Sequence, residues 1–275
     1  MDDEVWNIAG GVLRELSVYG VGLVVLGEVL PATLGRLAQN TPFELVSDPF
    51  MDTAAGIGAL YDPSRVLVEF KANIDACLRN RDVTRAIGFT LRIASGPIVD
   101  IVGVHWPSRT IAENAMIRQS LGSGLQTHVT NLVDLGGDDA FVIVCGDFND
   151  DPFDVSLTAN LFGTRDRGLA KKQQRALYNP FWRLVGERKA HDSDPVHEAA
   201  GTHFWDSGTQ TRWYTFDQFL FSSNFVNDGA WQLVESATEV WDRPPLAEDG
   251  GALHKGFDHY PVVVGIRSRI AGAPP

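Results

Sequence analysis

The stretch Phe141–Asn149, FVIVCGDFN, predicts a buried β-strand that ends in two polar side chains. Its first five residues are apolar and three of them are β-branched, which is typical of a strand inside a core. Asp147 and Asn149 follow Gly146, and residues two apart in an extended chain point to the same side. Such a carboxylate and amide can hold a phosphate, a metal-bound water or both. The alternative is an ordinary Asp/Asn turn. This stretch alone favours the turn, so the interpretation depends on the other strand ends.

The composition indicates a globular protein with an excess of negative charge. Of its 275 residues, 44% are hydrophobic and 21% are charged, and the formal net charge is −12. This charge argues against a uniformly basic surface for nucleic acid, although it is compatible with a local basic strip. No internal repeat or long linker divides the chain. We therefore expect a single domain over residues 1–275.

The sequence lacks the features that direct a protein into or across a membrane. It shows no signal-peptide pattern, and no apolar run approaches the roughly 20 residues that span a bilayer. The two cysteines, Cys77 and Cys145, provide no disulfide framework, which favours a reducing compartment. We therefore expect a cytoplasmic protein without stable membrane insertion, while a peripheral membrane role stays open.

Other predicted strands also carry polar side chains within them or at their ends. These strands are Val5–Ile8, Gly22–Leu26, Ile98–Val104, Arg212–Phe221 and Val262–Ile266. With the first stretch, their polar residues are Asn7, Glu28, His105, Asp147, Asn149, Asp217, Asp258 and His259. Each residue alone is more simply explained as a cap or a solvent-facing group, but six such placements in one chain indicate a shared site. Because helices are few among the many strands, we expect two sheets packed face to face with helices outside.

This set of side chains suits metal-assisted attack of water on a phosphate ester. Carboxylates hold Mg²⁺ or Mn²⁺, which prefer oxygen ligands, and such an ion neutralises phosphate charge. An Asp–His pair orients and charges an imidazole beside the phosphorus. Amide donors and a second imidazole bind the non-bridging oxygens as negative charge develops.

Six short motifs together resemble the endonuclease/exonuclease/phosphatase superfamily of DNase-I-like enzymes. In order, they are WNI, VVLGEV, VHWPSR, VCGDFND, FDQFLFS and FDHYPV. They run from residue 5 to residue 264 in the order of the family. GDFN followed much later by DHxP is a specific combination, whereas any one motif is weak.

The resemblance implies a four-layered α/β sandwich, in which two packed, mostly antiparallel sheets are flanked by helices. It also implies one Mg²⁺ site at one edge, for which Mn²⁺ is an alternative ion. By this analogy Glu28 is the principal metal ligand, and Asp258 and Asn7 assist it.

The same resemblance implies roles for the remaining polar residues. Asp147 would orient or deprotonate the attacking water, and Asn149 would position the water or the phosphate. Asp217 would pair with His259, which would act on the scissile phosphate as an acid–base or electrostatic group. His105 would bind a phosphate oxygen.

The chain departs from the family pattern at two positions beside these residues. Gly27 precedes Glu28 where many relatives have Gln, and Phe257 precedes Asp258 where many have Ser. Some relatives pair the middle histidine with a Glu on an earlier strand, and in this chain Glu69 is the nearest acid in sequence. The other histidines belong to no motif, and we expect them to be surface or structural residues: His128, His191, His197, His203 and His254.

We expect the substrate to be nucleic acid, with DNA favoured, cleaved by endo- or exonuclease action. The basic cluster Arg165–Arg175 and the aromatic-basic stretch YNPFWR after it suit a polyanion, although a run of charges is usually a solvated face. The expected substrate-binding residues are Arg109, Lys171, Lys172 and Arg175. Residues 160–200 would form either a substrate clamp or a face for a protein partner.

Two other functions fit the same sequence. A phosphatase or phospholipase-type phosphodiesterase would act on inositol phosphates, sphingomyelin or other lipid headgroups, and the charge of −12 favours it somewhat. A non-catalytic binding protein would have lost one or more site residues, whereas every expected position is filled. The sequence leaves open DNA or RNA, endo or exo action, and the oligomeric state.

Overall fold

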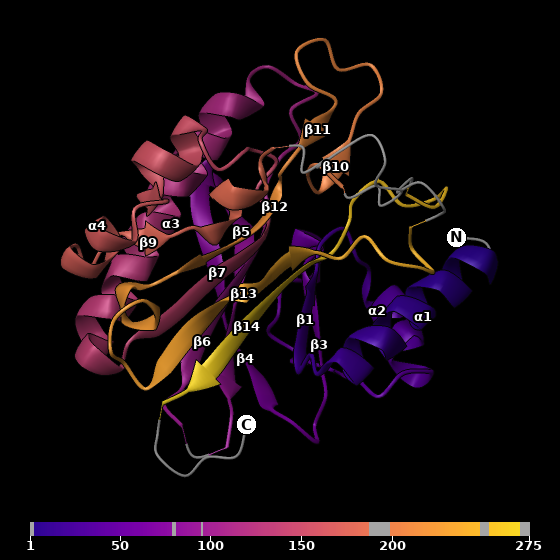
Figure 1. The fold of residues 1–275 in the computed structure, drawn as a ribbon, viewed down its shortest axis with the longest axis horizontal. Helices are drawn as coiled ribbons and strands as arrows, with labels where there is room; N and C mark the ends of the chain where they lie inside the picture. The colour runs from indigo at the N-terminus through magenta and orange to yellow at the C-terminus, as the bar shows by residue number, and fades with distance from the viewer. Residues whose placement is uncertain (1–2, 79–80, 95, 187–198, 248–252, 270–275) are drawn as a thin grey trace.

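A computed structural model describes residues 3–78, 81–94, 96–186, 199–247 and 253–269 (Figure 1). The largest sheet has seven strands in the order β4-β5-β6-β7-β12-β9-β8. In chain order these strands are β4 (Leu67–Leu78), β5 (Arg81–Arg92), β6 (Val99–His105), β7 (Phe141–Asp147), β8 (Gly163–Thr164), β9 (Leu177–Tyr178) and β12 (Asp217–Phe221). Pairing is antiparallel except between β6 and β7 and between β8 and β9.

Three smaller sheets accompany the large one. A three-stranded sheet has the order β1-β3-β2, and β13-β14 and β10-β11 are two-stranded. The strands are β1 (Leu23–Leu26), β2 (Glu44–Leu45), β3 (Gly58–Tyr61), β10 (His203–Phe204), β11 (Trp213–Tyr214), β13 (Trp231–Val240) and β14 (Val262–Ser268). All of these pairs are antiparallel, so the sheets are mostly antiparallel, as expected.

Helices cover the outer faces of the sheets. The α-helices are α1 (Asp3–Tyr19), α2 (Pro31–Gln39), α3 (Asn114–Gly136) and α4 (Arg167–Lys172). Short 3₁₀ or π turns occupy Thr53–Ala55, Gly137–Asp139, Ser156–Asn160, Pro180–Leu184 and Ser223–Phe225. In Figure 1, α3 and α4 lie on one side of the large sheet, and α1 and α2 lie beyond β1 and β3 on the other. This arrangement confirms the α/β sandwich. Within the described residues, no helix has the length and apolar character needed to cross a bilayer.

Strand β7 shows why the continuous apolar runs fold this way. Phe141, Ile143 and Cys145 face the core between the sheets. Val142 and Val144 face the opposite core, against α3. Because alternate side chains of a strand point to opposite faces, a strand covered on both sides must be apolar at every position.

The segment Val5–Ile8, predicted as a strand, lies instead in helix α1. The buried apolar residues Val5, Ile8, Val12 and Leu16 recur every three or four positions along that helix. A short apolar run does not distinguish a strand from a helix. The helical spacing of the buried residues over the whole of Asp3–Tyr19 identifies this segment as a helix. Asn7 is consequently exposed on the helix.

Two other strand predictions also need correction. The predicted strand Gly22–Leu26 forms β1 from Leu23 onward, and all four residues of β1 are only half-buried at the edge of their sheet. The expected strand Arg212–Phe221 is divided into β11 and β12. Between them, the backbone N–H of Thr215 donates to Asp151 Oδ1 at 2.8 Å, and that of Phe216 donates to a threonine hydroxyl. These side-chain bonds replace the strand ladder.

Candidate active site

Three strands of the large sheet end side by side and bring three predicted site residues together. β6 is parallel to β7, with His105 opposite Asp147, and β12 is antiparallel to β7, with Asp217 opposite Asp147. Residues opposite each other on neighbouring strands have Cβ atoms about 4.5–5.5 Å apart. The side chains therefore form one row at the edge of the sheet, where the apolar runs end.

His259 joins this row from the segment just before β14. Its Nδ1 lies 2.7 Å from Oδ2 of Asp217, so the ring N–H donates to the carboxylate. Burial lowers the pKa of this histidine, but the carboxylates of Asp217, Asp147 and Asp258 outweigh burial and raise that pKa to about 9. His259 is therefore a cation at neutral pH.

Asn149 is turned back onto Asp147. Its backbone N–H donates to Oδ1 of Asp147 at 2.7 Å, and its Nδ2 donates to Oδ2 at 2.7 Å and to the carbonyl of Trp106 at 2.9 Å. The φ of Asn149 is 51°, a left-handed conformation that Asn tolerates better than most residues. Burial, followed by the charge of Asp217, raises the pKa of Asp147 to about 7. The stretch thus forms an Asp/Asn turn, and that turn presents a buried carboxyl group to the row.

Glu28 is the acidic partner of His105. Its Oε1 lies 3.3 Å from His105 Nε2, and 73% of the Glu28 side chain is exposed. Glu69, the nearest acid in sequence, instead lies 3.6 Å from Arg92. Burial lowers the pKa of His105, although Glu28 raises it. His105 therefore orients Glu28 through Nε2. The contact of His105 with a phosphate oxygen stays a prediction.

The carboxylates at this edge fit a divalent cation. The ligand atoms of Asp147, Asp217 and His259 lie within 4.8 Å of one another. The pKa of Asp147 is raised by burial and then by Asp217, with a smaller contribution from Glu28. A bound cation would offset this concentration of negative charge. Asp147 and Asp217 provide carboxylate oxygens, which Mg²⁺ and Mn²⁺ prefer, and Glu28 lies outside this group against His105.

The two other expected metal ligands, Asp258 and Asn7, do not belong to this group. Asp258 is exposed and groups with His203 and His259. Asn7 makes no hydrogen bond with Glu28 or Asp258 in the described part of the chain, and it lies exposed on α1. Its role as a ligand stays a prediction.

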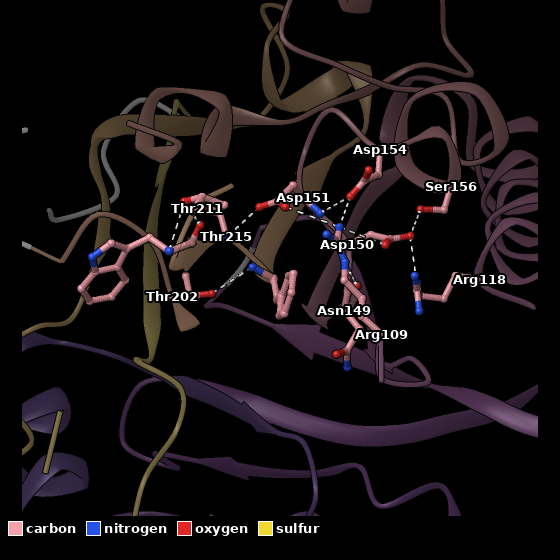
Figure 2. A network of polar contacts seen from close by, with 12 residues as sticks. Arg109, Arg118, Asn149, Asp150, Asp151, Asp154, Ser156, Thr202, Thr211 and Thr215 are labelled. Carbon is pink, nitrogen blue, oxygen red and sulfur yellow. Dashed lines mark hydrogen bonds and ion pairs between the residues drawn. The ribbon is translucent and has the colours of Figure 1, made fainter. Parts of the chain in front are cut away.

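Arg109 binds carboxylates of the protein itself (Figure 2). Its guanidinium contacts Asp150 at 3.1 Å and Asp151 at 3.4 Å, and it also pairs with Asp154. Its Nε donates to the backbone carbonyl of Asn149 at 2.8 Å. The sequence predicted that Arg109 would bind substrate, and this contact stays a prediction. The structure places Arg109 under the Asp147–Asn149 turn, where it holds that turn.

A second arginine extends the same network. Arg118 is buried, its Nε lies 2.9 Å from Oδ2 of Asp150, and it also donates to the carbonyl of Pro107 at 2.9 Å. Ser156 donates to the same oxygen of Asp150 at 2.5 Å (Figure 2). Buried carboxylates are stable only when paired and hydrogen-bonded. The network therefore fixes the turn from below, a role that the sequence did not predict.

Two more residues beside the row were not predicted. His203 lies with its ring centroid 4.5 Å from that of His259. Arg85 precedes Ala86 on β5, and Ala86 pairs with Val104, the residue before His105. The charge of Arg85 lowers the pKa of His105, and among the described residues the buried Nε of Arg85 has no hydrogen-bond partner. Neither residue belongs to a sequence motif, and only the strand register identifies them.

The predicted basic cluster lies away from this row. Lys171 and Lys172 are in the last turn of α4, which packs against the turn Ser223–Phe225 that follows the far end of β12. Arg175 lies 3.5 Å from Asp134, near the C-terminal end of α3. Figure 1 shows α4 on the opposite side of the molecule from β10. Contact of these residues with substrate stays a prediction, as does a partner face on 160–200, of which 187–198 lie outside the described residues.

The sequence matches the model of the endonuclease/exonuclease/phosphatase family over residues 53–265. The comparison with curated proteins finds no match.

Solved structures with similar folds cover nearly the whole chain. The human Nocturnin catalytic domain with bound sulfate anion is 18% identical, has a TM-score of 0.59, and the match covers 98% of this chain and 88% of that one. D. rerio TDP2 complexed with single strand DNA product is 17% identical, with a TM-score of 0.54 and coverage of 94% and 91%. A mannosyl-6-phosphatase of Bacteroides thetaiotaomicron is 16% identical, with a TM-score of 0.56 and coverage of 95% and 91%. At these identities the likeness shows a shared fold.

Proposed function

Because this chain belongs to the endonuclease/exonuclease/phosphatase family, we propose that it hydrolyses phosphodiester bonds in nucleic acid, with DNA as the favoured substrate. Members of this family are phosphoester hydrolases, which gives the class of enzyme. The substrate and the ion are the parts that we propose, with Mg²⁺ favoured over Mn²⁺.

The metal would be held by Glu28, and Asp258 and Asn7 would assist. When bound, it supplies positive charge that neutralises the phosphate and stabilises the leaving oxygen. His105 orients Glu28 through the contact of 3.3 Å. This arrangement follows the usual pattern in which an outer hydrogen bond fixes a metal-binding side chain.

Asp147 and Asn149 would handle the attacking water. Because burial and Asp217 raise the pKa of Asp147 to about 7, its carboxylate is a better base than an ordinary aspartate near neutral pH. Asn149 holds both oxygens of this carboxylate at 2.7 Å and thereby fixes its orientation. Arg109 holds the backbone of Asn149, so the positioning extends into the network below.

His259 and Arg85 would bind the negative charge of the phosphate. The pair with Asp217 keeps His259 protonated and fixes its ring, which leaves Nε2 to donate to a phosphate oxygen. Arg85 lies beside His105 without an ion-pair partner in the described part of the chain, and its planar guanidinium suits two phosphate oxygens.

The observation that carries the choice of nucleic acid is an aromatic and basic hairpin beside the site. β10 and β11 form it, and β10 begins with His203 next to His259. Phe204 is 38% exposed and Trp205 is 55% exposed. The guanidinium of Arg212 lies 5.5 Å from the Phe204 ring. Exposed rings with a neighbouring arginine are the means by which proteins stack unpaired bases.

A second candidate is a phosphatase or phosphodiesterase for small or lipid-derived phosphate esters. Arg109 is paired with three carboxylates, which leaves less positive charge for a long polyanion. The tip of the hairpin, residues 206–212, is DSGTQTR and is polar. Insertion of this hairpin into a bilayer is therefore disfavoured, and a water-soluble ester fits this candidate better than a membrane lipid.

A substrate panel tests the proposal. Supercoiled plasmid, linear duplex, single-stranded DNA and RNA are incubated with the protein and Mg²⁺, beside inositol phosphates, sugar phosphates and sphingomyelin. We expect cleavage of nucleic acid, with single-stranded DNA cut fastest, and no cleavage in EDTA. Phosphate release from the small esters with intact nucleic acid would instead establish the second candidate.

A further inference from the structure

His203 lies against the active site but belongs to none of the expected motifs. The β10–β11 hairpin holds it, its ring stacks on Phe216 at a centroid distance of 5.4 Å, and it forms an isolated β-bridge with His259. The ligand atoms of His203, Asp258 and His259 lie within 4.8 Å of one another. Two imidazoles and a carboxylate thus converge at a half-exposed position beside the carboxylate row.

The hydrogen bonds of the two imidazoles leave the same atom of each ring available. Nδ1 of His203 lies 3.0 Å from the backbone carbonyl of Asp258, and since a carbonyl only accepts, Nδ1 donates. Nδ1 of His259 donates to the carboxylate of Asp217 at 2.7 Å. Among the described residues, Nε2 of each ring has no hydrogen-bond partner. Histidines that bind metals almost always donate their other N–H to a carbonyl or a carboxylate in this way.

We propose that His203, Asp258 and His259 bind Zn²⁺ at a site next to Glu28, with Asp258 shared between the zinc ligands and the residues that would hold Mg²⁺. A set of two nitrogens and one oxygen suits Zn²⁺ better than Mg²⁺, which prefers oxygen alone. Ligand atoms around a tetrahedral zinc ion are roughly 3.3–3.5 Å apart, given bonds of about 2.0–2.1 Å. The present spacing, within 4.8 Å, is compatible with this value once the exposed Asp258 side chain turns toward the two rings, and water would complete the coordination.

Occupation of this site removes His259 from catalysis. When Zn²⁺ bonds to Nε2, the proton on that atom passes to solvent, and Nε2 no longer donates to a phosphate oxygen. Zinc is thus an inhibitor that competes with the phosphate for His259, and His203 is the residue that creates this sensitivity. This consequence rests on the proposed function, whereas the binding of zinc does not.

Zinc binding is therefore measured directly. The affinity for Zn²⁺ is determined by competition with a chromophoric chelator, in excess Mg²⁺, for the unmutated protein and for His203→Phe, which keeps the aromatic contact with Phe216. His128→Phe is the matched control, because His128 is a half-buried histidine on α3 outside this group. Circular dichroism verifies that each variant is folded, and His203→Asn provides a second substitution. Co²⁺ added to the unmutated protein gives an independent optical signal for a four-coordinate nitrogen and oxygen site.

We expect His203→Phe and His203→Asn to weaken Zn²⁺ binding by more than about tenfold, since loss of a partner outside the ligand shell alone costs roughly 10–100-fold. His128→Phe should bind as the unmutated protein does. Inhibition of hydrolysis by Zn²⁺, expressed relative to the zinc-free rate of each variant, should weaken in parallel. Equal affinity in the His203 variants, or the absence of the Co²⁺ signal, would overturn the proposal. Since binding is read without hydrolysis, its outcome is independent of the substrate assignment.

Discussion

Nδ1 of His259 lies 2.7 Å from Oδ2 of Asp217, although 42 residues separate them in the chain. Asp217 in turn lies opposite Asp147 on the neighbouring strand. These two relationships place a protonated imidazole, its counter-ion and a carboxyl group of raised pKa side by side. The electrostatics of the site depend on this row, and the predictions below alter it one group at a time.

Replacement of Asp217 should lower the pKa of His259. The carboxylate of Asp217 is the largest influence that raises this pKa to about 9, so Asp217→Asn should lower it by roughly 1–3 units. The basic limb of the pH–rate profile should move to lower pH by the same amount. NMR titration of His259 gives the pKa, and an unchanged value would show that the pair does not control it.

Replacement of Asp147 should stabilise the metal-free protein. The pKa of this carboxyl is about 7 in the fold against about 3.8 when unfolded. The native state therefore binds more protons between these values, and stability falls as pH rises from about 4 to 7. Asp147→Asn removes this cost, so above pH 7 in EDTA we expect a higher Tm, by about 2–4 °C for each kcal/mol gained. At pH 4, where the carboxyl is protonated in the fold, the gain should largely vanish. Equal gains at both pH values would contradict the assigned pKa.

Substitutions of Arg109 distinguish whether this residue positions the Asp147–Asn149 turn or contacts the substrate. Because it holds the carbonyl of Asn149 at 2.8 Å, Arg109→Lys should lower kcat more than it raises KM, by roughly tenfold or more. Arg109→Ala should be worse and should also lower Tm, since buried Asp150 and Asp151 each lose one of their partners. A rise in KM with kcat unchanged would instead support the substrate contact that the sequence predicted for Arg109.

Two alternatives exist for the cation that binds DNA phosphates: Arg85 beside the row, or the distant basic cluster of Lys171, Lys172 and Arg175. If charge beside the row matters most, Arg85→Ala should raise KM for DNA about tenfold and reduce its salt dependence. The sequence instead predicts this effect for the combined replacement of Lys171, Lys172 and Arg175 by Ala. Measurement of DNA binding against salt concentration for both variants decides between them, and a normal salt slope in Arg85→Ala would exclude a phosphate contact there.

The exposed ring of Trp205 tests the stacking surface. Trp205→Ala should weaken binding of single-stranded DNA by about 1–3 kcal/mol, the usual contribution of one stacked base. Trp205→Phe should retain most of it, and Leu135→Ala, which removes an exposed apolar residue at the C-terminal end of α3, should have no effect. Fluorescence anisotropy of a labelled oligonucleotide measures each affinity. Equal loss for Trp205→Ala and Leu135→Ala would rule out stacking.

Much of the fold and the principal site residues could be predicted from the sequence. The run Phe141–Cys145 is apolar at every position because β7 is covered on both faces, and a polar group after such a run is conspicuous. Asp147, Asp217 and His259 follow or precede runs of this kind, and the structure brings them together.

Other features depended on partners remote in sequence. Arg109 looks like a free cation beside His105, but its carbonyl partner is 40 residues away. Arg167, in the basic run around Lys171, and Arg183 both pair with Glu235 of β13, a contact that the sequence did not predict. At the N-terminus, the short apolar stretch Val5–Ile8 suggested a strand. It is part of a longer helix because its apolar residues continue a helical spacing that extends to Leu16.

The most direct test of the central claim is hydrolysis of single-stranded DNA by the unmutated protein, Asp147→Asn and Asp228→Asn in Mg²⁺ and in EDTA. Asp228 is an exposed aspartate that pairs with Arg269, so its replacement controls for the loss of a carboxylate elsewhere. We predict cleavage by the unmutated protein and Asp228→Asn that requires Mg²⁺, with a loss of at least about 100-fold in Asp147→Asn. Cleavage by Asp147→Asn at the normal rate, or cleavage that persists in EDTA, would contradict the account.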